Sequence, residues 1–148
     1  MKLLHIAQVD DLEKLLPLVE GFHAHQGIEM SYEARLGALQ PLLEGIPQGV
    51  CYLIGPRKAP VGYIVVSFGY SVEMGGIDGM IDEFFIREKV RKRGMGSEVL
   101  MTLLPALREH GVKALHLEVD RADEGVQRLY RKAGFEPRER YMLMTRTR

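Results

Sequence analysis

Residues 91–96 read Arg91-Lys92-Arg93-Gly94-Met95-Gly96. They follow a strand-like run at residues 80–86 and precede a Leu-rich helical run from about residue 97 to residue 110. Two glycines one residue apart let the backbone turn sharply and aim successive N–H groups at one oxygen-rich ligand. The following helix adds unpaired N–H groups and a positive dipole end, and the basic side chains can contact further phosphate oxygens. The motif predicts a pyrophosphate-binding turn.

Two other phosphate loops do not fit this segment. A Walker loop needs Gly-Lys-Ser/Thr after a four-residue gap, and the sequence contains no such string. A dinucleotide fingerprint needs a third glycine three residues beyond Gly96, where Val99 stands. A basic turn before a helix can also be a plain solvated connection, so the interpretation needs support from the rest of the chain.

Length and composition indicate one domain, residues 1–148, that is long enough to bury a core. The single cysteine, Cys51, cannot form an internal disulfide and lies in an apolar run, so we expect a core residue and a reducing, cytoplasmic setting. Neither a signal peptide nor a membrane-spanning run is recognisable, which predicts a soluble protein without a membrane partner. One cysteine and scattered histidines lack metal-ligand spacing, and we expect no metal.

The net charge is zero, but the charges are unevenly distributed. Residues 1–50 hold 3 Lys and Arg against 7 Asp and Glu, residues 51–86 hold 2 against 4, and residues 87–148 hold 15 against 9. A basic C-terminal part suits an anionic ligand, and an acidic N-terminal part suits a cationic one. Ordinary solvated faces are the alternative for most of the individual charges.

Hydrophobic periodicity gives a β-α-α-β-β-β-α-β-α-β(β) order without linkers or repeats. The expected strands are residues 3–6, 50–54, 60–72, 79–86, 114–119 and 139–147, with Phe135 before the last, and the expected helices are residues 11–25, 31–43, 97–110 and 123–133. The fold class is therefore α/β (α+β), with a mixed, mostly antiparallel sheet of about six or seven strands and helices on both faces.

Three features stand in a fixed order along the chain: Ile81-Asp82-Glu83-Phe84-Phe85-Ile86, the Arg-x-x-Gly-x-Gly turn, and Leu129-Tyr130-Arg131-Lys132-Ala133-Gly134-Phe135. Together they closely resemble the GNAT superfamily of N-acetyltransferases, over nearly the entire chain. The resemblance implies that acetyl-CoA binds where the strands at residues 80–86 and 114–119 splay apart. Its pyrophosphate would be held by Arg91, Lys92, Arg93, Gly94, Met95, Gly96 and Ser97.

The resemblance further implies that backbone groups near Phe84, Phe85 and Ile86 pair with the pantetheine arm. Core packing is the alternative for the side chains of Phe84 and Phe85, and the alternation of a strand favours it for at least one of them. Asp123 takes a position where relatives often have asparagine; it is assigned to cofactor binding by this match. It can cap the last helix, but it lacks an amide N–H to donate.

Acyl transfer to an amine needs a base, because a lysine-like amine titrates at about 10.4 and is mostly protonated at neutral pH. The resemblance implies an acidic residue on the strand, which here is Asp82 or Glu83, with Glu83 slightly favoured for its longer reach. In a regular strand only one of them can face the acceptor, although a bulge would change that. By the same resemblance Tyr130 protonates the leaving thiolate; packing in the last helix is its alternative role.

The sequence thus predicts an acetyltransferase that moves acetyl from acetyl-CoA to a primary amine by direct attack in a ternary complex. Small amines, polyamines, aminoglycosides and protein amines all fit as acceptors, and His23, His25, Glu29 and Tyr32 lie where relatives shape the acceptor pocket. A non-catalytic coenzyme A sensor of the same fold is the alternative. Nucleic-acid binding ranks last because no recognition module is present, so we expect no nucleic-acid partner. The resemblance also allows a homodimer paired through the C-terminal strand.

Overall fold

The computed structural model describes residues 2–91 and 94–147. The chain forms two compact units, Met1–Glu118 and Val119–Arg148. Within the described residues, the first unit contains the sheet and three α-helices, and the second contains one α-helix. The expected single domain over residues 1–148 stays a prediction.

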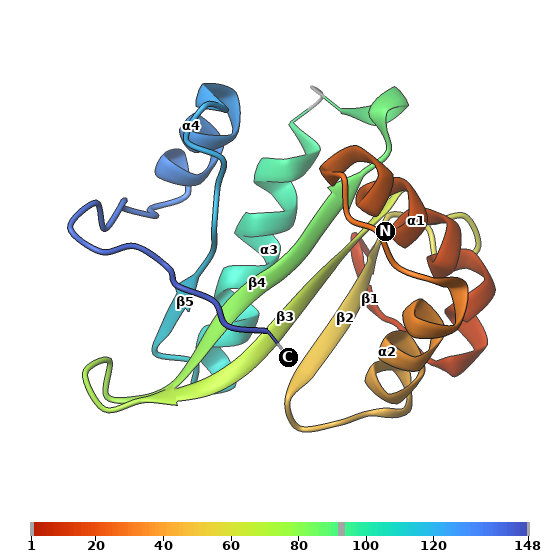
Figure 1. Ribbon diagram of the computed structural model, residues 1–148, viewed down its shortest axis with the longest axis horizontal. Helices are drawn as coiled ribbons and strands as arrows, with labels where there is room; N and C mark the ends of the chain where they lie inside the picture. The colour runs from red at the N-terminus through yellow and green to blue at the C-terminus, as the bar shows by residue number, and fades with distance from the viewer. Residues whose placement is uncertain (1, 92–93, 148) are drawn as a thin grey trace. The chain divides into compact units, whose positions relative to one another are not determined.

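The sheet consists of β1 (Leu4–Ile6), β2 (Gly49–Ile54), β3 (Gly62–Ser71), β4 (Gly76–Ile86) and β5 (Ala114–His116), in that spatial order (Figure 1). The first four strands pair antiparallel, and β5 pairs parallel to β4. This mixed, mostly antiparallel sheet confirms the predicted fold class. The expected number of six or seven strands is wrong for the described residues, which form five.

The missing strand is the one expected at residues 139–147, which have no strand assigned to them. A strand needs a neighbour for its backbone hydrogen bonds, and alternating side chains indicate a face without specifying that neighbour. The apolar residues of this segment are largely exposed; they are Tyr141, Met142, Leu143 and Met144. The alternation in the sequence is therefore not sufficient evidence for a strand here.

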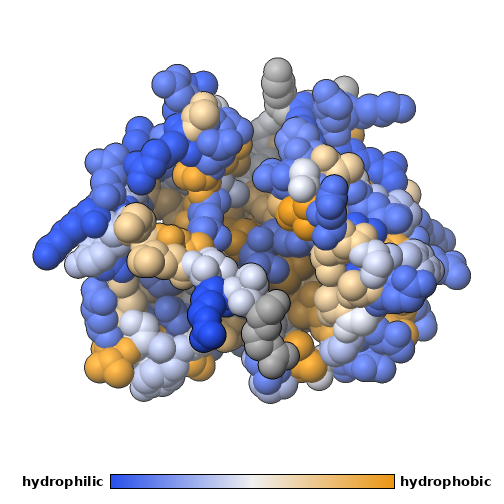
Figure 2. All heavy atoms as spheres, viewed as in Figure 1, coloured by the Kyte–Doolittle hydropathy of each residue, from blue (hydrophilic) through white to orange (hydrophobic). Residues whose placement is uncertain are grey.

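The helices of the first unit are α1 (Leu12–Gln26), α2 (Tyr32–Glu44) and α3 (Met95–Glu109), with short 3-10 turns at Val9–Asp11 and Glu88–Val90. Figure 1 shows α1 and α2 on one side of the sheet and α3 on the other. This confirms the expectation of helices on both faces. Hydrophilic residues cover most of the surface in the same view, with hydrophobic patches between them (Figure 2).

The core under α1 and α2 follows from the alternation of the strands. Leu15, Leu18 and Val19 of α1 and Leu39 and Leu43 of α2 pack in one cluster with alternate strand residues, Cys51, Leu53, Tyr63 and Val65. The intervening residues Ile64 and Val66 are buried outside this cluster, as are the α3 residues Val99, Leu100 and Leu103. Burial of Cys51 as an apolar filler confirms its predicted core role, and burial raises the pKa of its thiol to about 12.

A buried carboxylate fixes the start of α1. Asp11 is 2% exposed and accepts a hydrogen bond from the Gln8 backbone N–H (2.9 Å). Its carboxylate also pairs with Arg57 (2.7 Å) on the β2–β3 connection and with Lys14 (3.2 Å). Burial opposes the charge, but the hydrogen bonds from Gln8, Lys14 and Arg57 outweigh it and lower the pKa of Asp11.

The second unit contains α4 (Glu124–Lys132), whose N-cap is Asp123. The Asp123 carboxylate accepts a hydrogen bond from the Val126 backbone N–H (3.0 Å), which confirms the predicted cap. Beyond the helix, Gly134 takes a left-handed φ of 100°, and the ring of Phe135 packs edge-on against Tyr130 at 5.6 Å. None of the described helices, in either unit, is both long and apolar enough to cross a membrane.

Candidate active site

A bulge in β4 brings two adjacent carboxylates to one face of the sheet. The ladder pairs Val65 with Glu83 and then Val66 with Ile81, which leaves Asp82 without a partner on β3. Glu83 therefore shares the face of Val65, under α1 and α2, and Asp82 reaches the same face because it alternates with Ile81. In a regular strand only one of the two carboxylates could face the acceptor, and the bulge allows both to do so.

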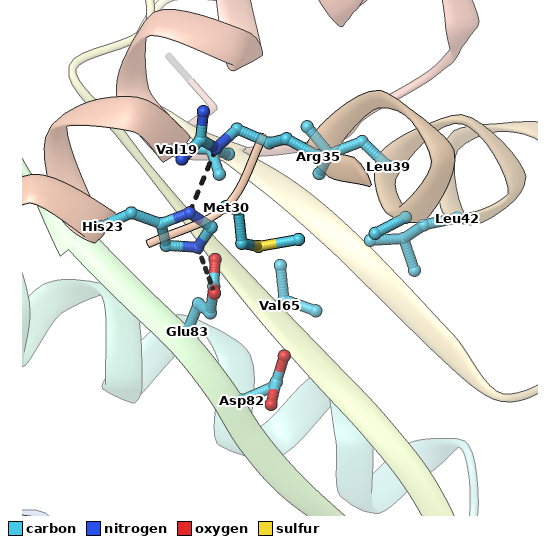
Figure 3. Close-up of a pocket in the computed structure, with 10 residues that line it drawn as sticks. Val19, His23, Met30, Arg35, Leu39, Leu42, Val65, Asp82 and Glu83 are labelled. Carbon is cyan, nitrogen blue, oxygen red and sulfur yellow. Dashed lines mark hydrogen bonds and ion pairs between the residues drawn. The ribbon is translucent and has the colours of Figure 1, made fainter. Parts of the chain in front are cut away.

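Both carboxylates line a cavity of about 260 Å³ between the sheet and the first two helices (Figure 3). Its polar lining also includes His23 of α1 and Arg35 of α2. The rest of the lining is apolar and consists of Val19, Met30, Ala38, Leu39, Leu42 and Val65. In Figure 3, Asp82 and Glu83 point into the cavity from β4, and Met30 extends between His23 and Leu42.

Glu83 is held by two hydrogen bonds from distant parts of the chain. The Tyr63 hydroxyl donates to Glu83 Oε1 (2.7 Å), and His23 Nε2 lies 2.7 Å from Glu83 Oε2. Arg35 Nε donates to His23 Nδ1 (3.1 Å). A guanidinium can only donate, so His23 Nδ1 is the acceptor and its Nε2–H donates to Glu83. The chain of donors from Arg35 to Glu83 orients the carboxylate.

Asp82 differs from Glu83 in its surroundings. Among the residues that the structure describes, none donates a hydrogen bond to the Asp82 carboxylate, which is exposed at the cavity. Displacement of water by the surrounding protein raises the pKa of Asp82 above its usual value of 3.8, and the negative charges of Glu83 and Glu118 add to this effect. Asp82 therefore has a raised pKa and, among the described residues, no hydrogen-bond donor on its carboxylate.

The Tyr63 hydroxyl remains a donor at all relevant pH values. Burial raises the pKa of Tyr63, and the adjacent Glu83 carboxylate raises it further. Tyr63 has an exposed fraction of 0%, so its hydroxyl has no competing water. Its hydrogen bond of 2.7 Å fixes the position of Glu83 Oε1.

The predicted phosphate turn leads directly into α3. Gly94 is the N-cap and takes a left-handed φ of 76°, which favours glycine. Glu98 N–H donates to the Gly94 carbonyl (3.1 Å), so the N–H groups of Met95, Gly96 and Ser97 precede the helical hydrogen bonds. Gly94 has no side chain to cap them, which leaves these groups suitable for an anion. Lys92 and Arg93, which the sequence also assigned to this turn, lie outside the described residues.

Arg91 is tied to the end of β4. Its Nε donates to the Ile86 carbonyl (2.6 Å), and its guanidinium lies 5.2 Å from the centre of the Phe85 ring. Phe85 in turn packs against Phe22 and Tyr63, with ring centroids 6.0 Å and 6.4 Å apart. Both phenylalanines are half-buried. The Phe85 side chain packs against the core cluster, and Phe84 is not among the residues that do so.

The two parallel strands separate next to the bulge. Pairing between β4 and β5 covers Asp78 to Met80 and ends at the Met80–His116 pair, while β4 continues to Ile86. The sheet is therefore only partly splayed. In the described part of the chain, residues 81–86 have no ladder partner on the edge opposite β3. Apart from the Ile86 carbonyl, which accepts from Arg91, this edge can offer backbone groups to a ligand.

Two further predicted site residues, Tyr130 and Asp123, belong to the second unit. Burial raises the pKa of the Tyr130 phenol to about 12, so it is protonated at neutral pH. Asp123 uses its carboxylate as the cap of α4. Within residues 2–91 and 94–147, no group of three or more His, Cys, Asp or Glu side chains could hold a metal ion.

The sequence did not predict the partners of Glu83. Tyr63 and His23 lie 20 and 60 residues away along the chain, and no local pattern connects them. Of the residues considered for an acceptor pocket, His23 lines the cavity, whereas His25, Glu29 and Tyr32 do not. Met30 also lines the cavity. The only signal for it in the sequence is that it is an apolar residue in the connection between two predicted helices.

Comparison with known proteins gives a consistent picture. The model of the family described as Acetyltransferase (GNAT) family matches residues 18–135. An integron cassette protein from the mobile metagenome of Cole Harbour Salt Marsh is 31% identical, with a TM-score of 0.83, and the match covers 97% of this chain and 89% of that one. No curated protein sequence matches the chain.

Two other solved structures have similar folds. A candidate acetyltransferase from Arthrobacter sp. FB24 is 26% identical, with a TM-score of 0.79, and the match covers 100% of this chain and 96% of that one. An aminoglycoside acetyltransferase from an uncultured soil metagenomic sample, in complex with sisomicin, is 15% identical with a TM-score of 0.80. That match covers 97% of this chain and 94% of the other, and at this identity it shows the fold alone.

Proposed function

The chain belongs to the GNAT acetyltransferase family, and on that premise we propose that it transfers acetyl from acetyl-CoA to a primary amine by direct attack in a ternary complex. The family uses acetyl-CoA as its cosubstrate. The observation that carries the proposal is the bulge at Asp82, which directs two carboxylates into one cavity beside an unpaired strand edge. A carboxylate can remove the proton from an ammonium acceptor, and an unpaired strand edge can form backbone hydrogen bonds with a pantetheine arm.

The residues that would hold acetyl-CoA follow from the donors that the fold leaves free. The N–H groups of Met95, Gly96 and Ser97 can bind the pyrophosphate at the start of α3. Arg91 sets the turn against β4 through the Ile86 carbonyl, and its remaining guanidinium N–H groups can reach an anion. The unpaired edge of residues 84–86 can pair with the amide groups of pantetheine. When bound, acetyl-CoA supplies the activated acetyl thioester.

Asp82 is the base in this proposal, with Glu83 as its fixed partner. The acceptor enters as an ammonium ion, because a primary amine titrates at about 10.4. Glu83, already ordered by Tyr63 and His23, attracts and orients this cation. Among the described residues no donor engages the Asp82 carboxylate, and its pKa is raised, so Asp82 is available to take the proton. The sequence alone slightly favoured Glu83, but both oxygens of that carboxylate are engaged by Tyr63 and His23.

Tyr130 and Asp123 keep their proposed roles on grounds of family resemblance. The Tyr130 phenol is protonated at neutral pH and can donate a proton to the leaving thiolate. Asp123 can accept hydrogen bonds from the amides of the cofactor arm with the oxygen that α4 does not use.

A thiol-release assay with acetyl-CoA and a panel of primary amines tests the proposal. We expect amine-dependent release of free coenzyme A with at least one acceptor, and loss of that release in Asp82→Asn. Binding of acetyl-CoA without turnover on any amine would instead support the coenzyme A sensor. Failure to bind acetyl-CoA at all would remove both functions.

A further inference from the structure

We propose that the acceptor is a small primary amine with a single ammonium group and an aliphatic or aromatic body. This inference rests on the proposed function and narrows its substrate class. It is carried by the division of the cavity into a charged end and an apolar end. The charged end is formed by Asp82 and Glu83 on β4, and the apolar end by side chains of α1, α2, their connection and β3; His23 and Arg35 also line the cavity.

The charged end suits one cation. Asp82 and Glu83 are adjacent, so an ammonium group between them satisfies both. Arg35, which also lines the cavity, donates to His23 and lies 3.8 Å from the Glu20 carboxylate. Its charge is therefore balanced within the protein, and the acceptor need not carry a carboxylate to pair with it.

The apolar end disfavours a second cation. Val19, Leu39, Leu42 and Val65 offer neither a hydrogen-bond acceptor nor a negative charge in their side chains. An ammonium group placed against them would lose its water without replacement, which is costly. A methylene or aromatic group in the same place gains free energy by leaving water. Polyamines and aminoglycosides carry several cationic groups, so we expect them to bind this apolar end less well.

The connection between α1 and α2 extends the apolar character beyond the cavity. Met30 lines the cavity from this connection, and its neighbours along the chain include Ile28 and Tyr32. All three are exposed, at 41% for Ile28, 38% for Met30 and 55% for Tyr32. A hydrophobic acceptor body would bury part of this apolar surface on entering the cavity.

A matched pair of acceptors, hexylamine and 1,6-diaminohexane, tests the inference in the thiol-release assay. The two have the same chain length and differ by one ammonium group at the far end. We expect kcat/KM to be at least tenfold higher for hexylamine. Along the series ethylamine, butylamine and hexylamine, we expect kcat/KM to rise by up to about fourfold for each methylene that becomes buried.

Two variants of Met30 provide the control. Met30→Glu places a carboxylate at the apolar end, so it should raise kcat/KM for the diamine and lower it for hexylamine. Met30→Gln has a similar shape without the charge and should leave the preference for hexylamine in place. Both changes lie at an exposed position in a connection, so they leave the buried core unaltered.

The outcomes separate this inference from the proposed function. If the diamine or the aminoglycoside kanamycin is the better acceptor, or if alkyl length has no effect, the inference is wrong while acetyl transfer to amines stands. If no amine in the panel is acetylated although acetyl-CoA binds, the proposed function is wrong and the inference fails with it.

Discussion

His23 Nε2 lies 2.7 Å from the Glu83 carboxylate, across 60 residues of sequence. The histidine is fixed from its other side by Arg35, and the carboxylate by Tyr63. Both side chains of this pair are largely buried: 5% of the His23 side chain and 19% of the Glu83 side chain are exposed. Glu83 is therefore ordered before any ligand binds, and it leaves the neighbouring Asp82 as the unengaged carboxylate of the cavity.

Asp82→Asn and Glu83→Gln should differ in their kinetic effects. Asp82→Asn removes the proposed base and should lower kcat/KM by about 10²–10⁴-fold, mainly through kcat. Glu83→Gln removes a charge that orients the ammonium group, so it should mainly raise KM for the amine. Steady-state kinetics in the thiol-release assay measures both. Equal and mild effects of the two changes would argue against either as the base.

The raised pKa of Asp82 also predicts opposite effects on activity and stability. Native Asp82 binds a proton more tightly than in the unfolded chain, so stability falls as pH rises from 3.8 through the native pKa. Asp82→Asn should therefore raise the free energy of unfolding at pH 7, measured by urea denaturation, and this gain should vanish in acid. The wild-type kcat/KM should fall as pH drops through the same pKa. A stability loss in Asp82→Asn at pH 7 would contradict this.

His23 should act on turnover by positioning Glu83. His23→Leu removes the donor to Glu83 and should lower kcat/KM about tenfold or more, whereas His23→Gln can still donate and should recover part of the loss. His25→Leu is the control, because His25 is exposed on the same helix. A positioning role should change the KM for the amine and the pH profile of kcat/KM, whereas a loss of structure should lower kcat without changing either. Similar kinetics for His23→Leu and His25→Leu would remove the proposed role.

Gly94→Ala should weaken cofactor binding more than it disturbs the fold. Gly94 has a φ of 76° and Gly111, after the other end of α3, has a φ of 86°; an added Cβ meets nothing within 4 Å at either position. Both alanine variants should thus lose about 1–2 kcal/mol of unfolding free energy from backbone strain alone. Only Gly94→Ala should raise the Kd for coenzyme A, about tenfold, in calorimetry. An equal Kd in both variants would remove the phosphate turn from the account.

Tyr130→Phe tests the proposed proton donor. The change keeps the ring that packs against Phe135, so the stability should change little. We expect kcat to fall about tenfold or more while the Kd for acetyl-CoA stays within about twofold. Tyr70→Phe, at a residue that is 76% exposed, is the matched control and should leave kcat unchanged. Normal turnover in Tyr130→Phe would leave only a packing role for Tyr130.

The sequence predicted most of the fold because the responsible signals are local. The core faces of α1 and α3, the caps of the last helix and the turn at Gly94 each follow from a few neighbouring residues. The bulge at Asp82 could not be predicted, since it is a mismatch between two strands and not a property of either. For the same reason the sequence left Asp82 and Glu83 as alternatives, where the structure brings both together.

The failures of prediction have a similar origin. The strand expected at residues 139–147 was inferred from alternation, which defines two faces but no neighbouring strand. The pairing of His23 with Glu83 depends on the docking of α1 over β4, which no spacing in the sequence encodes. Long-range packing therefore decides which of the candidate polar residues form the site.

The most direct measurement of the central claim is mass spectrometry of the reaction of the protein with acetyl-CoA and hexylamine. The account predicts N-acetylhexylamine in an amount equal to the free coenzyme A released, and neither product above background in a variant that combines Asp82→Asn with Glu83→Gln. Saturation of the protein with acetyl-CoA without formation of an acetylated amine from any member of the amine panel would contradict it.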